Sequence, residues 1–240
     1  MSKLFSSCCS RLEASLTENM EEDRAIDLVK EQMKPLLEDL SYLETPLAEM
    51  AEGKTKQLAT DYNDVTLYRS LNGKFSIRLF VWEALVPYPV HDHGSWGVVG
   101  CLAGQVEETK YRRQDRAQDE NYARLEIFSN RKLNPGAMTK VYPLDRGIHH
   151  MTAYGNCTAL TLHIYGTPVR KGYIRGFVPE RKTTYRIFPP KYGVKVIGLK
   201  GLSAIDTPQA PSIIEEVEGE GHPLIKELLP IIRSQTPPSS

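Results

Sequence analysis

Two histidines, His91 and His93, stand one residue apart at the end of a strand-like run, and His149 follows in a later segment of the same character. In an extended strand, residues i and i+2 point to the same face. His91 and His93 can therefore direct two imidazoles at one point, and a second strand can bring His149 against them. Three neutral imidazoles around one cation leave coordination positions open for chemistry. The spacing predicts a metal site at these three residues.

The third position of this site has two candidates, because His149 is followed directly by His150. Adjacent residues of a strand face opposite ways, so only one of the two can be a ligand. Strand periodicity alone leaves the choice open. A single histidine is more often an ordinary core or surface residue, and the prediction depends on the His-x-His pair being joined by a third histidine.

A second polar cluster is formed by Thr161, His163 and Tyr165. These residues occupy positions i, i+2 and i+4 of a run whose intervening residues are apolar, so all three line one face of a strand. A hydroxyl, an imidazole and a phenol in a row can form a hydrogen-bond relay that positions a proton beside a metal. The alternative is a polar stripe inside a barrel with no catalytic role.

The elements that must position these side chains are short strands. Gly and Pro separate the segments, no helical periodicity runs through them, and Asn72-Gly73 is a strong hairpin turn. This pattern predicts a mainly β fold, an antiparallel barrel or double-sheet jelly roll. The expected strands cover residues 65–71, 74–82, 97–102, 105–111, 122–128, 138–142, 148–154 and 159–165.

The flanking regions differ in character, and we expect three parts: an N-terminal helical extension over 1–60 that packs on the barrel, the barrel over 61–188, and a partly flexible C-terminal extension over 189–240. Apolar residues at three- and four-residue steps predict helix from about 17 to 52. Asn19 and Glu22 resemble a capping box, and Pro35 predicts a break or kink. Cys8 and Cys9 are expected in an exposed tail. In the last part, 193–199 is a candidate strand and 223–233 a candidate short helix.

Composition excludes several classes of function. Lys+Arg and Asp+Glu are equal at 30 each, so no overall field favours nucleic acid or an anionic membrane. No run of about 18 apolar residues occurs, the N-terminus lacks the apolar stretch of a signal peptide, and the four cysteines fit no zinc-binding spacing. We therefore expect a cytoplasmic protein, in a reducing setting, whose partners are small molecules.

The linked motifs resemble the thiol dioxygenases of the cysteine dioxygenase family, within the cupin superfamily. The resemblance covers about residues 60 to 180. Gly97 stands where the cupin pattern usually has a glutamate after His-x-His, and Gly104 follows after six intervening residues. The segments that carry the resemblance are Gly73-Lys74-Phe75, Val90-His91-Asp92-His93, Gly100-Cys101-Leu102-Ala103-Gly104-Gln105-Val106-Glu107-Glu108-Thr109, Gly147-Ile148-His149 and Leu162-His163-Ile164-Tyr165.

This resemblance implies a cupin-type double-stranded β-helix that binds Fe(II) through His91, His93 and His149. His149 is preferred to His150 because it matches the family's glycine–aliphatic–histidine step. The family's Ser–His–Tyr relay is implied at Thr161, His163 and Tyr165. The implied reaction adds both atoms of O2 to the sulfur of a small carboxylated thiol, cysteine or 3-mercaptopropionate, and gives a sulfinate. A monomer is the expectation for the family.

Gly97 also indicates which branch of the family the chain resembles. Animal members carry a cysteine that is cross-linked to the relay tyrosine, and counting back from Gly104 places that position at Gly97. The resemblance therefore implies no cross-link there. In this respect the chain is similar to the bacterial branch, and to its 3-mercaptopropionate dioxygenases.

Because the family's substrates carry a carboxylate, a buried arginine is expected to bind it. Arg175, ten residues past Tyr165, is the first candidate and is similar to the late arginine of the 3-mercaptopropionate dioxygenases. Arg170 is the second candidate. Arg69, which follows Tyr68, corresponds to the early arginine of the true cysteine dioxygenases if a gap of several residues is allowed.

Two other functional classes fit the same histidines. One is a cupin isomerase or hydrolase that uses another divalent metal, because geometry alone does not select iron over Zn, Mn or Ni. The other is a non-enzymatic cupin domain that binds a ligand in its pocket. The predicted relay beside the histidines favours the dioxygenase. The missing glutamate weakens the isomerase or hydrolase, because many such cupins use four protein ligands.

Overall fold

The structure is a computed structural model that describes residues 2–51, 64–170 and 172–188. The chain divides into two compact units, residues 1–186 and 187–240. The candidate strand at 193–199 and the candidate helix at 223–233 lie outside the described residues. Everything below concerns the first unit.

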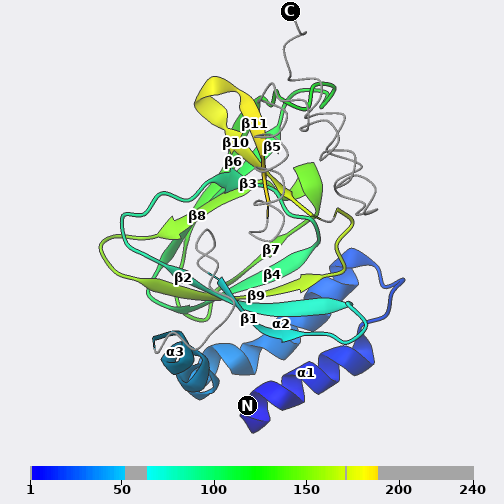
Figure 1. Cartoon of the computed structure of the whole chain (residues 1–240), viewed down its shortest axis with the longest axis vertical. Helices are drawn as coiled ribbons and strands as arrows, with labels where there is room; N and C mark the ends of the chain where they lie inside the picture. The colour runs from blue at the N-terminus through cyan, green and yellow to red at the C-terminus, as the bar shows by residue number, and fades with distance from the viewer. Residues whose placement is uncertain (1, 52–63, 171, 189–240) are drawn as a thin grey trace, which may run out of the picture. The chain divides into compact units, whose positions relative to one another are not determined.

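Two β-sheets form the body of this unit (Figure 1). The first has five strands in the order β1 (Asp64–Arg69), β2 (Phe75–Trp82), β9 (Ala159–Gly166), β4 (Gly97–Ala103) and β7 (Met138–Val141). The second has six strands in the order β11 (Thr183–Ile187), β10 (Ile174–Val178), β3 (Val90–His91), β8 (His149–Ala153), β5 (Val106–Arg113) and β6 (Leu125–Leu133).

The strand pairing identifies the architecture. After β5 the chain turns back on itself, so that β5 pairs with β6, β4 with β7, β3 with β8 and β2 with β9, each antiparallel. Successive pairs alternate between the two sheets, which is the folded-over hairpin of a double-sheet jelly roll. This confirms the predicted cupin-type fold class. The two sheets remain separate in their hydrogen bonding and do not close into one continuous barrel.

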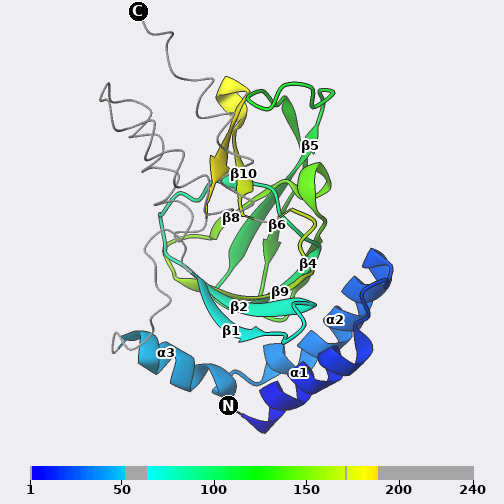
Figure 2. The same cartoon turned by 45° about the vertical axis from the view of Figure 1, so that its right-hand side comes forward.

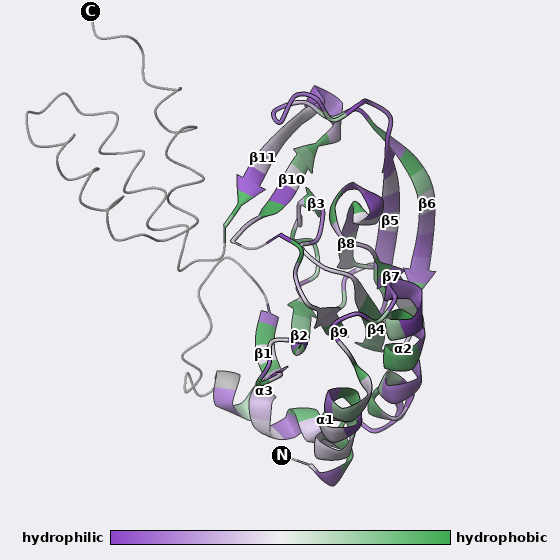
Figure 3. Ribbon diagram, turned by 90° about the vertical axis from the view of Figure 1, so that its right-hand side faces the viewer, coloured by the Kyte–Doolittle hydropathy of each residue, from purple (hydrophilic) through white to green (hydrophobic). Residues whose placement is uncertain are grey.

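Helices cover the outer face of the five-stranded sheet (Figure 2). Their bounds are α1 (Lys3–Ser15), α2 (Glu22–Glu38), the short 3-10 helix η1 (Ser41–Leu43) and α3 (Glu44–Ala51). Both hydrophobic and hydrophilic residues occur along the first two helices, as in amphipathic helices whose apolar side packs on a core (Figure 3). The approach of α2 is close, because a Cβ added at Gly100 of β4 would lie 2.7 Å from both Met33 Sδ and Leu37 Cδ2.

The N-terminus differs from the expected exposed tail. Residues 3–15 form α1, and Cys8 and Cys9 are buried in the core between α1 and its neighbours, so that expectation is wrong. In this segment the apolar residues come in short groups separated by serines, so the sequence showed no clear helical periodicity. The predicted capping box is also wrong, because α2 begins after Glu21, whose side chain accepts a hydrogen bond from the Arg24 amide.

The inner face of the five-stranded sheet is set by the alternation of β2. Phe75, Ile77 and Leu79 belong to the core shared with the helices, so the even-numbered residues of β2 face the second sheet. Side chains on this inner face are therefore the ones of this sheet that can reach the predicted metal site and form the predicted relay. None of the helices in the described ranges is long and apolar enough to cross a membrane.

Two strands, β10 and β11, went unpredicted. Arg175 and Gly176 break the apolar alternation of β10, and the strand-like run before the histidine pair is the two-residue strand β3. The mostly exposed edge strand β6 runs over Leu125–Leu133 instead of 122–128, because a strand at an edge has few buried residues to mark its bounds. The missed β10 and β11 matter because β10 lies directly beside the first histidine of the pair.

Candidate metal centre and hydrogen-bonded relay

The structure brings His91, His93 and His149 together between the two sheets. His91 on β3 is the register partner of His149 on β8, and His93 follows two residues after His91. The ring centroids of His91 and His93 lie 4.9 and 4.7 Å from that of His149. One nitrogen from each ring lies within 4.8 Å of the other two. His150 pairs with Thr109 on the opposite face of β8, so His149 is the member of that pair that joins the cluster.

Hydrogen bonds orient the first two rings. Nδ1 of His91 lies 3.0 Å from the carbonyl oxygen of Pro89, and Nδ1 of His93 lies 3.1 Å from that of Gly147. A carbonyl can only accept, so both Nδ1 atoms carry the proton and both Nε2 atoms keep a lone pair. Nε2 of His93 is buried and has no hydrogen-bond partner in the described part of the chain. An unpaired buried acceptor is costly, and a bound metal would satisfy it, so these residues fit a divalent cation.

The third ring is held by a carboxylate. Nδ1 of His149 lies 3.0 Å from Oε1 of Glu108, which is completely buried on β5. Burial raises the pKa of this carboxyl, but the hydrogen bond from His149 and the positive charge of Lys110 more than offset it, so the pKa lies below its usual range. Glu108 is therefore ionised behind the ligand.

The imidazoles of His91 and His93 are neutral. Burial, and then the neighbouring His149, lower the pKa of His91 to about 3. Burial and the other two histidines place the pKa of His93 well below its ordinary value. A metal needs the unprotonated ring nitrogen, so these two rings can bind a cation at neutral pH without losing a proton.

The relay predicted from the sequence is assembled as a continuous chain of hydrogen bonds. Thr161 Oγ1 lies 2.7 Å from Nε2 of His163, and Nδ1 of His163 lies 2.7 Å from the hydroxyl of Tyr165. The indole of Trp82 on β2 donates to Thr161 Oγ1 at 2.7 Å. Trp82 extends the relay by one residue that sequence reasoning missed.

The donors give the relay a direction. The indole N–H of Trp82 can only donate, and Thr161 has no acceptor other than His163 within the described residues, so its hydroxyl donates to Nε2. Neutral His163 then carries its proton on Nδ1 and donates to the Tyr165 oxygen. The phenolic proton of Tyr165 remains available for a ligand. The Tyr165 ring lies 5.6 Å from that of His93, which places this donor beside the three histidines.

Gly97 makes room for this tyrosine. It is the register partner of Tyr165 on the neighbouring strand, and an added Cβ would lie 2.5 Å from Cδ1 of the phenol ring. Any larger residue would have to displace the ring. The position that the sequence analysis matched to the cross-linking cysteine of animal cysteine dioxygenases therefore lies in direct contact with Tyr165.

The buried His163 predicts a pH dependence of stability. Burial, the nearby histidines and Arg78 hold its folded-state pKa well below the ordinary value of 6.5. The unfolded chain therefore takes up this proton first as the pH falls, and stability is lost below about pH 6.5 by up to about 1.4 kcal/mol per pH unit. Urea unfolding of the metal-free protein between pH 7.5 and 4.5 should show a shallower slope in His163→Gln. Equal slopes in the two proteins would mean that His163 is protonated as easily in the fold as outside it.

The first candidate for carboxylate binding, Arg175, faces away from the histidines. Its neighbour Gly176 is the register partner of His91, so the Arg175 side chain lies on the other face of β10. There its guanidinium lies 3.9 Å from Oε1 of Glu120.

The second candidate, Arg170, is engaged in holding the histidine pair. Its guanidinium donates to Oδ1 of Asp92, the buried residue between His91 and His93. The backbone amide of Arg175 donates to the same oxygen at 2.7 Å. These contacts fix the turn that carries the two ligands.

The third candidate, Arg69, ends β1 and is exposed, but it pairs in register with Ser76, which in turn pairs with Tyr165. It therefore shares the inner face of the sheet with the relay.

Arg78, which sequence reasoning did not select, lies deeper on the same face. It is the register partner of His163, and its NH1 lies 2.7 Å from Oδ2 of Asp64 on β1. The alternation of β2 could have identified it, because Ser76, Arg78 and Phe80 fall on one face. The sequence did not reveal that β2 pairs with β9, and this pairing places the relay on the same face as Arg78.

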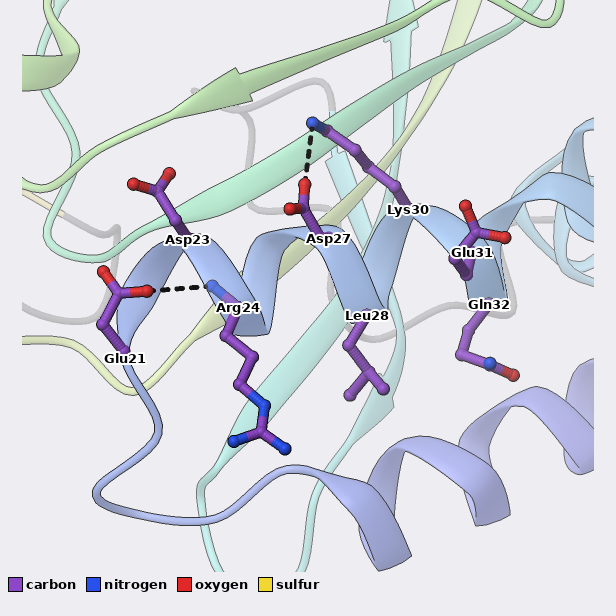
Figure 4. Close-up of a pocket in the computed structure, with 8 residues that line it drawn as sticks. All are labelled: Glu21, Asp23, Arg24, Asp27, Leu28, Lys30, Glu31 and Gln32. Carbon is purple, nitrogen blue, oxygen red and sulfur yellow. Dashed lines mark hydrogen bonds and ion pairs between the residues drawn. The ribbon is translucent and has the colours of Figure 1, made fainter.

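An open hollow also runs along the exposed side of α2, lined among others by Asp23, Arg24 and Asp27 (Figure 4). The helix separates it from the inner face of the sheet, and several of its charged side chains are paired, as Lys30 is with Asp27 at 3.3 Å and Asp23 is with Lys140 at 3.0 Å. It is a surface groove unrelated to the histidines.

No protein-family model matches the chain. Among solved structures it is similar to an RmlC-like cupin family protein from Methanocaldococcus jannaschii, at 12% identity over 49% of this chain and 90% of that chain, with a TM-score of 0.33. It is also similar to a cupin superfamily protein from Desulfitobacterium hafniense (15%, 48% and 84%, TM-score 0.32) and to a Cupin 2 conserved barrel domain protein from Salinispora arenicola (12%, 48% and 83%, TM-score 0.35). Because these TM-scores are low, the fold is assigned from the strand order described above and not from these similarities. The chain has a cupin-type fold with a three-histidine cluster suited to a metal ion.

Proposed function

We propose that this protein is an iron-dependent thiol dioxygenase that converts a small carboxylated thiol, cysteine or 3-mercaptopropionate, to its sulfinate. The observation that carries the proposal is the joint presence of three clustered histidines and the relay that ends at Tyr165, on facing walls of one jelly roll. A three-histidine set alone would suit several metals and reactions. The relay adds a proton donor beside it, which a storage or binding domain does not need.

The proposed reaction is balanced without a further reactant. One thiol and one O2 give one sulfinic acid, since both oxygen atoms are added to sulfur and the sulfur supplies the electrons. Bound Fe(II) would lower the pKa of the thiol and hold thiolate and oxygen in contact. His91, His93 and His149 would hold this ion.

The chain's own residues then have separate tasks. The phenol of Tyr165 donates a hydrogen bond to the substrate or to bound oxygen, and His163 keeps that proton directed outward by donating to the phenol oxygen itself. Phe80 stacks on the His163 ring at 4.1 Å between centroids and shields the relay from water. This arrangement positions a donor without introducing a charge.

For the carboxylate of the substrate, we propose Arg78 as the anchor. Its side chain is about one-third exposed, whereas its partner Asp64 is nearly buried. Within the described residues the guanidinium is therefore held from one side and keeps donors for a ligand on the other. Burial raises the pKa of Tyr165 and lowers that of His163, and Arg78 lies near enough for its charge to act on both groups. Arg69, further along the same face, could add a second charge at the entrance.

An oxygen-electrode assay tests the function. The iron-loaded protein should consume O2 and thiol in equal amounts when given cysteine or 3-mercaptopropionate, and mass spectrometry should find a sulfinate. Cysteamine, which lacks the carboxylate, serves as the comparison substrate. If fully iron-loaded protein consumes no oxygen with any of these thiols, the dioxygenase proposal is wrong, and the isomerase, hydrolase or binding alternatives take its place.

A substitution tests the role of the relay. Tyr165→Phe removes the phenolic hydroxyl but keeps the ring beside Gly97, so iron content should be unchanged while kcat falls about 100- to 1,000-fold through loss of one positioned donor. Steady-state kinetics and iron analysis on the same preparation measure both quantities. Tyr154→Phe, at an exposed tyrosine, is the control and should keep wild-type turnover. Full activity in Tyr165→Phe would remove the phenol from the mechanism.

A further inference from the structure

The candidate centre has no carboxylate among its three histidines, yet a buried carboxyl group lies one hydrogen bond behind it. Glu108 Oε1 is 3.0 Å from Nδ1 of His149, and the Glu108 side chain is completely buried. His91 and His93 use their Nδ1 atoms on backbone carbonyls instead. His149 is therefore the one histidine of the three whose Nδ1 faces an acidic side chain.

Two further residues hydrogen-bond this carboxylate in a fixed orientation, and Nζ of Lys110 lies 3.8 Å from its Oε1. Oε2 of Glu108 accepts from Nε of Arg131 at 3.0 Å, and NH2 of the same guanidinium also lies 3.0 Å away. The hydroxyl of Thr139, on the facing sheet, donates to Oε1 at 3.2 Å. Arg131 is the register partner of Glu108 on the edge strand β6 and is partly exposed. The result is a connected path from the protein surface to the metal ligand.

We propose that Glu108 is a positioning residue of the metal centre, which supplies through His149 the negative charge that a carboxylate ligand would otherwise give, and that Arg131 limits this effect. The proposal rests on the proposed function in one respect, that the three histidines hold a metal. A carboxylate that accepts from Nδ1 fixes the tautomer of a histidine, aims its Nε2 lone pair and raises its basicity as a ligand. The guanidinium shares the same carboxylate, so it withdraws part of that charge from His149.

This account predicts opposite effects for the two partners. Glu108→Gln removes the charge and should weaken metal binding about 10- to 100-fold. Arg131→Met removes one of the two competing cations and leaves Lys110, whose Nζ lies 3.8 Å from Glu108 Oε1, so the metal should bind at least as tightly as in the wild type. If the network only held the strands together, both substitutions would weaken binding.

The experiment is a titration of the metal-free full-length protein with Co2+, followed by visible absorption and by competition with a chelator of known affinity. The matched control is Glu107→Gln, at the adjacent residue of β5, whose side chain points to the other face. It should bind Co2+ as the wild type does. Circular dichroism of each metal-free protein checks that it is folded.

The outcomes separate this inference from the function on which it rests. A wild-type protein that fails to bind one Co2+ per chain would overturn the metal site and the proposed function together. A wild-type protein that binds Co2+, with Glu108→Gln within twofold of it, would overturn only the role of Glu108. If Glu108→Gln does not fold, Arg131→Met decides alone: an affinity equal to or higher than that of the wild type supports the proposal, and a lower affinity contradicts it.

Discussion

Purified His93→Ala protein is expected to contain almost no iron and to show no measurable thiol oxidation. His93 is buried, its Nδ1 is fixed on the Gly147 carbonyl, and its free Nε2 has no other partner in the described part of the chain. Loss of a direct ligand should cost more than the roughly 10- to 100-fold in metal affinity that loss of an outer partner costs. Iron analysis and the oxygen-electrode assay on the same sample measure both effects.

His150→Ala is the matched control for that experiment. It removes the adjacent histidine of β8, which faces the other way and pairs in register with Thr109. Iron content and turnover should stay close to those of the wild type. Iron binding that survives in His93→Ala, or that is lost equally in His150→Ala, would show that the metal is held elsewhere.

Arg78→Met is expected to lower kcat/KM for 3-mercaptopropionate about 10- to 100-fold, mainly through a higher KM. Methionine keeps much of the length of the side chain and removes the charge, and a charge-assisted hydrogen bond contributes about 1.5–3 kcal/mol. Activity on cysteamine, which has no carboxylate, should change much less. The ratio of the two substrates is therefore the measurement that reports on carboxylate binding.

Two further variants test whether the effect of Arg78→Met comes from lost substrate binding. Because Asp64 would be left nearly buried without its partner, the double variant Arg78→Met/Asp64→Asn removes both charges and separates substrate binding from stability. Arg175→Met is the control for the arginine that the family resemblance favoured and that faces Glu120 instead. If Arg175→Met raises KM and Arg78→Met does not, the substrate carboxylate binds at β10.

The parts of the site that follow a local period were predictable. His91 with His93, and Thr161 with His163 and Tyr165, repeat every second residue, and such a repeat on a strand places side chains on one face whatever the rest of the fold does. The same period, with Gly and Pro at the turns, predicted the strands that form most of the jelly roll. The residues that went unpredicted, Trp82, Arg78 and Glu108, are members of ordinary alternating strands. Their roles come from the strands beside them.

From its residues alone, the chain determines a mainly β fold and the relay on one strand face, because strand alternation is a property of the local backbone. His93 lies just past β3, where the contacts of Asp92 hold the turn that places it beside His91. Tertiary structure decided which groups meet. The pairing of β3 with β8 selected His149 over His150, and the pairing of β2 with β9 placed Arg78 and Trp82 beside the relay. Register depends on contacts between segments far apart in the chain, and a shift of one residue would turn each of these side chains to the opposite face.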